Sequence, residues 1–234
     1  MKTKVIIVTG KAQSGKSSAC DDIKMYLKGL GKSSKVYAFA DKLKEVCTQL
    51  FGLSHSQCWG ENSDKDSITK FKWSDLPLGS QLLAKVMDDI STPEKKISQK
   101  DFMTAREVMQ VWGTDIFRSF YSNCFVDATI SQIEEEDFDF ALICDARFPN
   151  ELDSFVKIEP IVFRLTRKVT DFTHPSETKL SSYDWGKFKN YRLIDNSDMT
   201  IADKNYFIRL ALENILEDNG YRASAHKTRR IRQR

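Results

Sequence analysis

Near its amino terminus the chain reads VIIVTGKAQSGKS, from Val5 to Ser17. This is a short apolar run followed by the pattern G-x-x-x-x-G-K-[ST] and then by a segment that can form a helix. A buried strand would deliver the chain to a glycine-bounded turn whose backbone N–H groups surround a phosphate, and the positive end of the helix dipole would add to the attraction. The pattern therefore predicts a phosphate-binding loop for ATP or GTP, but it does not name the reaction.

The residues of this loop have predicted tasks. Lys16 would reach the outer phosphates, and the Ser17 hydroxyl would bind Mg²⁺. A chance match to a short pattern is the alternative, but the loop lies directly between a Val/Ile strand and the helical segment Ser18 to Leu30, which argues against chance. The residues expected to hold the donor nucleotide are Gly10, Gln13, Ser14, Gly15, Lys16, Ser17 and Ser18.

Length and composition limit the class of protein. With 234 residues, 41% of them apolar, the chain can bury a substantial core, in one α/β domain with excursions or in two small domains. No run approaches the roughly 18 apolar residues of a membrane span, and the amino terminus lacks the pattern of a secretion signal. The five cysteines are scattered without a C-x-x-C pair, which is typical of reduced thiols in the cytoplasm. We therefore expect a cytoplasmic protein without a membrane contact.

The positive charge is concentrated at the carboxyl end. Residues 220–234 carry six Lys or Arg and no acid, so the remaining body has 30 basic and 33 acidic residues, although the formal net charge of the whole chain is +3. A short basic end of this kind is typical of a solvated, disordered tail. Contact of the tail with nucleic acid is the less favoured alternative, and it stays open.

Apolar strands alternate with helical segments along the rest of the chain. This alternation predicts an α/β fold of three layers, in which a five-stranded parallel sheet is covered by helices on both faces. Besides the first strand, strands are expected at 35–40, 140–145, 161–165 and 191–195, and helices at 41–51, 104–121, 125–135, 149–156 and 202–217. The expected core face of the last helix comprises Phe207, Leu210, Ala211 and Ile215.

Two segments do not fit this alternation. Residues 53–103 are polar and show helical periodicity only from Leu82 to Ile90, so we interpret them as an inserted element on the substrate side. Residues 165–190 are also polar and poorly patterned, which is typical of a lid. The expected organisation is one domain, 1–219, that includes the insertion and the lid, followed by the tail.

An acid ends the apolar strand expected at 140–145. In a protein with a phosphate loop, an acid at the carboxyl end of a neighbouring strand can hold the Mg²⁺ shell, and Asp145 has this position. Arg147 would project to the same side if the extended backbone continues. The alternative is a solvated turn, which the nearby loop disfavours. Ala146 stands where many hydrolytic motors have a water-activating glutamate, and an N-K-x-D motif is absent, which argues against a motor ATPase and a regulatory GTPase.

Three further arginines are candidates for phosphate contacts. Arg164 and Arg167 lead from the strand at 161–165 into the lid segment, where a mobile arginine can accelerate phosphoryl transfer by about 10³–10⁵. Arg106 opens the helix that follows the insertion, and its guanidinium can form a bidentate pair with an acceptor phosphate. For each of them a solvated surface residue is the alternative, which the pattern alone leaves open.

Taken together, these motifs resemble the bacteriophage deoxynucleoside monophosphate kinase family, in the nucleoside monophosphate kinase group of phosphate-loop proteins. The matching segments follow the family order over residues 4–217. The loop alone is unspecific, whereas the blocks at 104–118 and 145–151 are specific. Besides the loop, the matching residues are Phe39–Lys44, Thr104–Gln110, Gly113–Asp115 with Arg118, Asp145–Glu151, Arg164–Arg167 with His174–Glu177, and Asp195-Asn196.

The resemblance implies transfer of the γ-phosphate of ATP to a deoxynucleoside 5′-monophosphate, in the host cytoplasm if the chain is phage-encoded. Lys16 and Ser17 would take the donor phosphates and Mg²⁺, Asp145 would share the metal, and Asn196 would lie near the adenine. The implied catalytic residues are Lys16, Arg147, Arg164 and Arg167, the last two within the lid. The implied acceptor-binding residues are Asp41, Lys42, Arg106, Gln110, Asp145 and Arg147.

The chain departs from the family pattern at places that affect the acceptor. Ala105 and Trp112 stand where the family often has Pro and Leu, and residues 53–103 have no counterpart that we can name. The accepted base is therefore left open, as is a homodimer formed through the insertion. Two other functions are also compatible with the motifs: a kinase of another small phosphorylated acceptor, such as phosphomevalonate or dephospho-coenzyme A, and a nucleic-acid-associated ATPase that uses the tail.

Overall fold

The computed structural model describes residues 3–92, 96–167, 179–218 and 220. They form two compact units: the second consists of residues 39–128, and the first of the described residues before and after that segment. The predicted insertion, 53–103, lies wholly within the second unit, which also includes the segments on either side of it. The predicted tail lies outside the described residues apart from Gly220.

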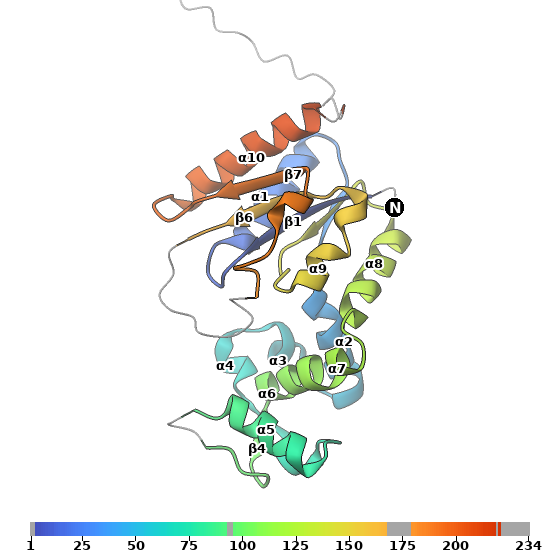
Figure 1. Cartoon of the computed structure of the whole chain (residues 1–234), viewed down its shortest axis with the longest axis vertical. Helices are drawn as coiled ribbons and strands as arrows, with labels where there is room; N and C mark the ends of the chain where they lie inside the picture. Colours follow the sequence, from blue (N-terminus) through green and yellow to red (C-terminus); the bar gives the residue numbers. More distant parts are fainter. Residues whose placement is uncertain (1–2, 93–95, 168–178, 219, 221–234) are drawn as a thin grey trace, which may run out of the picture. The chain divides into compact units, whose positions relative to one another are not determined.

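A five-stranded sheet forms the centre of the first unit (Figure 1). Its strands, in their order across the sheet, are β2 (Ser34–Tyr37), β5 (Phe140–Ile143), β1 (Lys4–Gly10), β6 (Ile161–Leu165) and β7 (Asn190–Ile194). All neighbouring strands are parallel. This confirms the predicted five-stranded parallel sheet, and it makes β1, the strand before the glycine loop, the central strand.

Helices cover both faces of this sheet, as predicted (Figure 1). On one face, Ile6 and Val8 of β1 belong to a core that α1 and α10 complete. Val5 and Ile7 point to the opposite face, because side chains alternate along a strand, and they are equally buried. The helices and 3₁₀ turns of this unit are α1 (Lys16–Gly29), α8 (Cys124–Glu136, from residue 129 on), α9 (Pro149–Asp153), η3 (Val156–Ile158), η5 (Trp185–Lys187) and α10 (Ile201–Asp218).

The last helix, α10, buries only part of the predicted face. Ile215 is buried and Ala211 packs against the core, as predicted, whereas Phe207 and Leu210 are 48% and 42% exposed. The apolar residues of this helix lie around most of its circumference, so their spacing is compatible with more than one core face. The buried positions are Lys204, Ile208, Leu212, Ile215 and Leu216.

The second unit has a hydrophobic core of its own, which includes Trp73, Met103 and Val108. Two short antiparallel strands in this unit were not predicted, because Ile68 and Phe102 expose their side chains and leave no alternating apolar pattern. The elements are α2 (Phe39–Phe51), α3 (His55–Trp59), α4 (Asn62–Lys65), β3 (Ile68–Lys72), η1 (Trp73–Asp75), α5 (Ser80–Ile90), β4 (Phe102–Thr104), α6 (Ala105–Gln110), η2 (Val111–Phe117), α7 (Arg118–Phe120) and the start of α8.

Two boundaries differ from the expected ones for identifiable reasons. The strand expected at 35–40 ends at Tyr37, and Phe39 already begins α2. The helix expected at 104–121 is continuous but becomes π-helical in η2, around Gly113. A Cβ atom on Gly113 would lie 2.6 Å from Cδ2 of Leu43, so the glycine allows α2 and η2 to approach closely.

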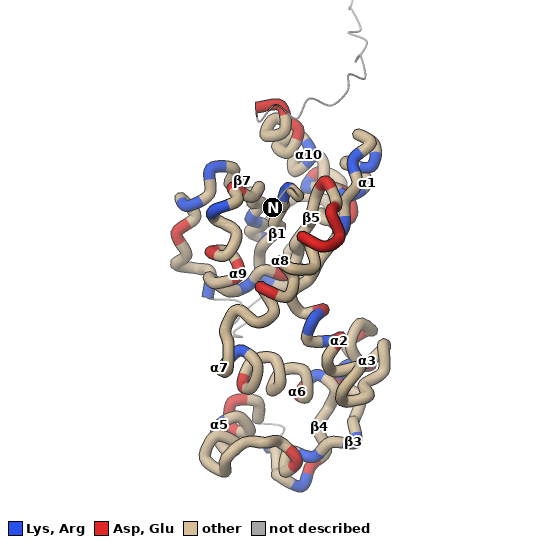
Figure 2. Tube along the Cα trace, turned by 90° about the vertical axis from the view of Figure 1, so that its right-hand side faces the viewer, with Lys and Arg blue, Asp and Glu red and all other residues tan. Residues whose placement is uncertain are grey.

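The described helices include none that is long and apolar enough to cross a membrane. Lys and Arg are interspersed with Asp and Glu along the described chain (Figure 2). This distribution agrees with a nearly balanced charge outside the carboxyl-terminal tail.

Candidate phosphate-binding site

The loop from Gly10 to Lys16 joins the central strand β1 to α1 and depends on two glycines. Gly10 has φ +151°, and a Cβ there would lie 2.6 Å from the carbonyl oxygen of Leu165 in the neighbouring strand β6. Gly15 is the N-cap residue of α1 and has the left-handed φ of +86°. Both backbone conformations favour glycine strongly. The sequence motif therefore forms a tight turn at the carboxyl edge of the parallel sheet, as predicted.

The amino end of α1 is open toward this turn. No side chain caps the helix, and its first turn contains no acid. The first N–H groups of a helix lack partners within the helix and carry the positive end of its dipole, so they attract an anion. Nζ of Lys16 lies over the loop and donates to the carbonyl oxygens of Gly10 (2.9 Å) and Lys11 (2.7 Å). The loop thus combines N–H donors and an ammonium group, which is what a phosphate requires.

A pocket of about 300 Å³ adjoins the loop within the first unit. Its walls are residues 13–18 of the loop and of α1, Arg167 after β6, and the segment from Asn196 to Lys204. The structure therefore brings together eight residues that the sequence assigned to nucleotide or phosphate contacts. They are Gln13, Ser14, Gly15, Lys16, Ser17, Ser18, Arg167 and Asn196.

Asn196 is one of the residues that line this pocket. It lies two residues after the end of β7, its side chain is almost fully buried, and Nδ2 donates to the carbonyl oxygen of Ser14 at 3.0 Å. Its Oδ1 has no hydrogen-bond partner among the described residues. A buried amide oxygen without a partner is costly, and it can accept a hydrogen bond from a ligand that enters the pocket.

Lys204 lines the same pocket and was missed by the sequence analysis. It is only 2% exposed, and burial lowers its pKa, with nearby Arg167 acting in the same direction and Asp22 and Cys20 opposing it. Its Nζ donates at 2.7 Å to the carbonyl oxygen of Gly15 and at 2.7 Å to Oγ of Ser18. No signal in the sequence marked it, because a single lysine in an amphipathic helix is usually assigned to the solvent face.

Asp145 and Arg147 lie in a segment that is fixed beside the loop. Thr9, the residue before Gly10, donates through Oγ1 to the carbonyl oxygen of Ala146 at 2.9 Å. The backbone N–H groups of Arg147 and Phe148 donate to Oε2 of buried Glu151 at 2.7 and 3.0 Å. Thr9 and Glu151 were given no task from the sequence, yet Thr9 holds the backbone between the two predicted site residues and Glu151 holds the backbone at Arg147 and just after it.

Arg164 does not belong to the lid, and this part of the prediction is wrong. It is the fourth residue of β6, and its guanidinium carbon lies 4.7 Å from the ring centre of Trp185 in η5. Stacking of this kind suits a guanidinium held between a strand and the next surface turn. Arg167 does follow the strand, but the part of the predicted lid from 168 to 178, which includes His174 to Glu177, lies outside the described residues.

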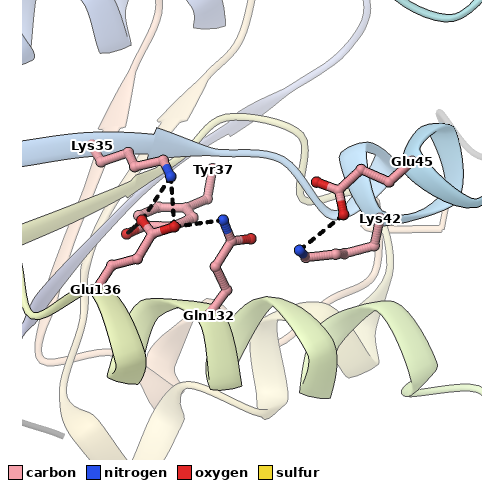
Figure 3. Close-up of polar contacts among 6 residues, drawn as sticks. All are labelled: Lys35, Tyr37, Lys42, Glu45, Gln132 and Glu136. Atoms are coloured by element: carbon pink, nitrogen blue, oxygen red, sulfur yellow. Dashed lines mark hydrogen bonds and ion pairs between the residues drawn. The ribbon is translucent and has the colours of Figure 1, made fainter.

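The predicted acceptor residues Asp41 and Lys42 form local pairs in the second unit. Oδ1 of Asp41 accepts hydrogen bonds from Nζ of Lys44 and from Nε1 of Trp59, each at 3.0 Å. Nζ of Lys42 lies 3.1 Å from Oε2 of Glu45 (Figure 3). Lys44 was named from the sequence only as part of the matching segment Phe39–Lys44, and Trp59 was not named.

Arg106 also has partners within the second unit. Its Nε donates to Oδ1 of Asp66 at 2.7 Å, and a terminal nitrogen donates to Oδ1 of Asn62 at 3.1 Å. Both the arginine and Asp66 are about half exposed, so a phosphate could exchange with the carboxylate at little cost. Gln110, one helical turn further along α6, is half-buried.

A separate polar network in the first unit ties β2 to α8 (Figure 3). Nζ of Lys35 lies 2.7 Å from each carboxylate oxygen of Glu136, and Tyr37 and Gln132 also donate to this carboxylate. These hydrogen bonds, that of Lys35 above all, lower the pKa of Glu136, against the opposing effect of burial. The network links two elements of the fold and does not border the pocket beside the loop.

Comparison with known proteins gives one informative similarity. No family model matches the chain. A protein of Acanthamoeba polyphaga mimivirus named "Putative deoxynucleotide monophosphate kinase" is 26% identical over 208 residues, which span 85% of this chain and 91% of that protein. A solved gluconokinase from Sinorhizobium meliloti 1021 aligns over 94% of this chain and 97% of its own chain at 13% identity, with a TM-score of 0.43.

Proposed function

We propose that this chain transfers the γ-phosphate of ATP to a deoxynucleoside 5′-monophosphate, giving ADP and the corresponding diphosphate. The observation that carries the proposal is the turn from Gly10 to Lys16, with its open helix end and with Lys16 lying over the loop carbonyls. The similarity to the mimivirus protein, whose name states a deoxynucleotide monophosphate kinase, supports the choice of acceptor.

The donor side of the proposed reaction lies in the first unit. The N–H groups at the start of α1 and the ammonium of Lys16 would bind the β- and γ-phosphates, and Arg167 would add positive charge at the same pocket. Asn196 offers its unpartnered Oδ1 to the rest of the nucleotide.

The residues also fit a magnesium ion that is shared with the nucleotide. The described part of the chain has no cluster of three His, Cys, Asp or Glu that could hold a metal by itself. Mg²⁺ in kinases is commonly held by one or two protein oxygens together with substrate phosphates. Ser17 and Asp145 would be those protein ligands, and the ion would neutralise charge on the transferred group.

The acceptor side needs cations rather than a base. A nucleoside monophosphate is already anionic near neutral pH, so its oxygen can attack without prior deprotonation, whereas its charge repels the donor. Arg147, whose backbone N–H donates to Glu151, and Arg106, with its exchangeable carboxylate partner, would offset this repulsion. Asp41, Lys42 and Gln110 are the further proposed acceptor contacts.

An acceptor panel tests the proposal. The purified chain is incubated with ATP and Mg²⁺, and ADP formation is followed with each of the four common deoxynucleoside monophosphates, the ribonucleotides, phosphomevalonate and dephospho-coenzyme A. We expect stimulation by at least one deoxynucleoside monophosphate and little ADP without an acceptor. Stimulation only by another acceptor, or hydrolysis that only DNA stimulates, would contradict the proposed function.

A further inference from the structure

Three side chains from the segment that follows β7 form hydrogen bonds with the phosphate loop and the start of α1. Asn196 donates to the carbonyl oxygen of Ser14, and Lys204 donates to that of Gly15. Asn205 donates through Nδ2 to the carbonyl oxygen of Ser18 at 3.3 Å. Three donors from one segment thus bind three carbonyl groups of the loop and of the first turn of α1.

Fixing these carbonyl groups also fixes the N–H groups that face the ligand. In a trans peptide the C=O of one residue and the N–H of the next point in opposite directions. The bond from Asn196 to Ser14 therefore orients the N–H of Gly15, and the bond from Lys204 to Gly15 orients the N–H of Lys16. Both N–H groups lie at the start of α1, where the loop motif places the phosphates.

Lys204 holds the central position of this support. Its ammonium lies so close to Gly15 that a Cβ on that residue would be 2.8 Å from Nζ. It also donates to Oγ of Ser18, whose hydroxyl in turn donates to the carbonyl oxygen of Gly15 at 3.0 Å. One ammonium group thereby holds the left-handed N-cap residue and the hydroxyl of the first helical turn.

A buried cation at this place also carries an electrostatic cost. Positive charge is unfavourable near the amino end of a helix, and a buried ammonium has lost most of its hydration. Asp22 of α1, the acid that raises the pKa of Lys204, forms an ion pair with Arg209 of α10, where Nε and Oδ2 are 3.2 Å apart. A phosphate chain bound at the loop would offset the cost, so the position favours binding of an anion.

We propose that Lys204 is a positioning residue of the nucleotide site, which orients the Gly15–Lys16 peptide of the phosphate loop and adds a cation behind it. The inference rests on the proposed function in so far as the loop must bind a nucleotide. It does not depend on the identity of the acceptor. The competing explanation is that Lys204 only stabilises the packing of α10 against α1 and has no effect on nucleotide binding.

Arg209 provides the matched control, because it is a cation of the same helix that also contacts α1 but does not touch the loop. The experiment measures MgADP binding by calorimetry, and thermal unfolding without nucleotide, for the wild-type chain and for Lys204→Met, Lys204→Gln and Arg209→Met. Met retains most of the length of the side chain without a donor or charge, whereas Gln retains a donor without the charge.

We expect Lys204→Met to weaken MgADP binding by about 10- to 100-fold, equivalent to roughly 1.4–2.8 kcal/mol. Its unfolding temperature without nucleotide should not fall, since an apolar group replaces a buried charge that lacks a direct carboxylate partner. Lys204→Gln should weaken MgADP binding by at least about threefold, but by less than Lys204→Met does. Arg209→Met should bind MgADP within about twofold of the wild type.

Equal MgADP affinity of the wild type and Lys204→Met would overturn the inference, as would equal losses in Lys204→Met and Arg209→Met. If Lys204→Met does not fold, Lys204→Gln decides, and wild-type affinity in that variant refutes the role. A wild-type chain that binds no MgADP would refute the donor site itself, and the inference with it. Normal binding without transfer to any deoxynucleotide would instead refute only the acceptor assignment.

Discussion

At the scale of single residues, the chemistry of the loop depends on how the ammonium group of Lys16 is hydrogen-bonded. Lys16 donates to two backbone carbonyls of its own loop. These carbonyl oxygens are neutral acceptors, whereas phosphate oxygens are charged and form stronger hydrogen bonds with an ammonium group. The side chain is therefore ready to exchange its partners when a nucleotide binds.

Replacing Lys16 by Ala should lower turnover by about 10²–10³-fold or more, because one preorganised cation at the transferring phosphate is lost. Stability should change little, since the two hydrogen bonds from its ammonium to loop carbonyls can be replaced by bonds to a phosphate. Steady-state kinetics with a saturating acceptor and thermal unfolding of the same sample check both parts. Near-normal turnover in the folded variant would remove Lys16 from the mechanism.

At the scale of elements, the positions of the site residues depend on links between neighbouring strands and helices. Thr9 fixes the segment after β5 to the end of β1, and Glu151 fixes the same segment to the start of α9. The helix α10 contacts the loop through Lys204, which donates to the carbonyl oxygen of Gly15. Lys35 and Glu136 link β2 to α8 in a comparable way, away from the pocket.

The link between β2 and α8 should make stability depend on pH. Because the pKa of Glu136 is lowered in the folded state, its ion pair stabilises the fold fully above the ordinary value of 4.5, and this contribution is lost as the pH falls through the folded pKa. Glu136→Gln should therefore destabilise the chain at pH 7 and have a shrinking effect toward pH 3. Urea unfolding of both proteins across this range measures the difference.

The pair is partly exposed, so its contribution should also decrease at high salt. Lys35→Met is the companion variant, and its loss of stability should follow the same pH dependence. A difference between wild type and Glu136→Gln that stays constant from pH 7 to pH 3 would show that the charge of Glu136 contributes nothing.

At the scale of the whole molecule, the described pocket beside the loop involves only residues between Gln13 and Lys204. The basic tail follows well after this range. Among the described residues, each of the two units has a hydrophobic core of its own.

Removal of residues 221–234 should therefore leave kinase turnover unchanged within about twofold, because no charge at the proposed site is removed. The measurement compares kcat and KM for ATP in the full-length and shortened chains, with and without duplex DNA. A large loss of turnover, or ATP hydrolysis that depends on both DNA and the tail, would favour the nucleic-acid-associated ATPase.

The sequence predicted the local parts of the site better than the distant ones. Gly10 to Ser17 and Asp145 carry their chemistry in short motifs next to apolar strands, and their strands lie in the sheet as expected. Lys204 acts through bonds to backbone groups that are far away in the sequence, which no residue pattern encodes, whereas Glu151 lies within the block at 145–151 but its task was not recognised. The α10 face was partly misassigned because a buried lysine is rare unless something accepts its hydrogen bonds, and here the acceptors lie 186 and 189 residues away.

The long separation between Lys204 and its acceptors has a consequence for synthesis of the chain. The glycine loop leaves the ribosome long before its partners, because the strand that precedes it pairs with strands from residues 140–143 and 161–165, and its support comes from residue 204. Contacts between such distant segments form late, because a long loop must close first. The nucleotide site therefore matures only after residue 204 has been translated, and a product terminated before this residue should have an incompletely supported loop.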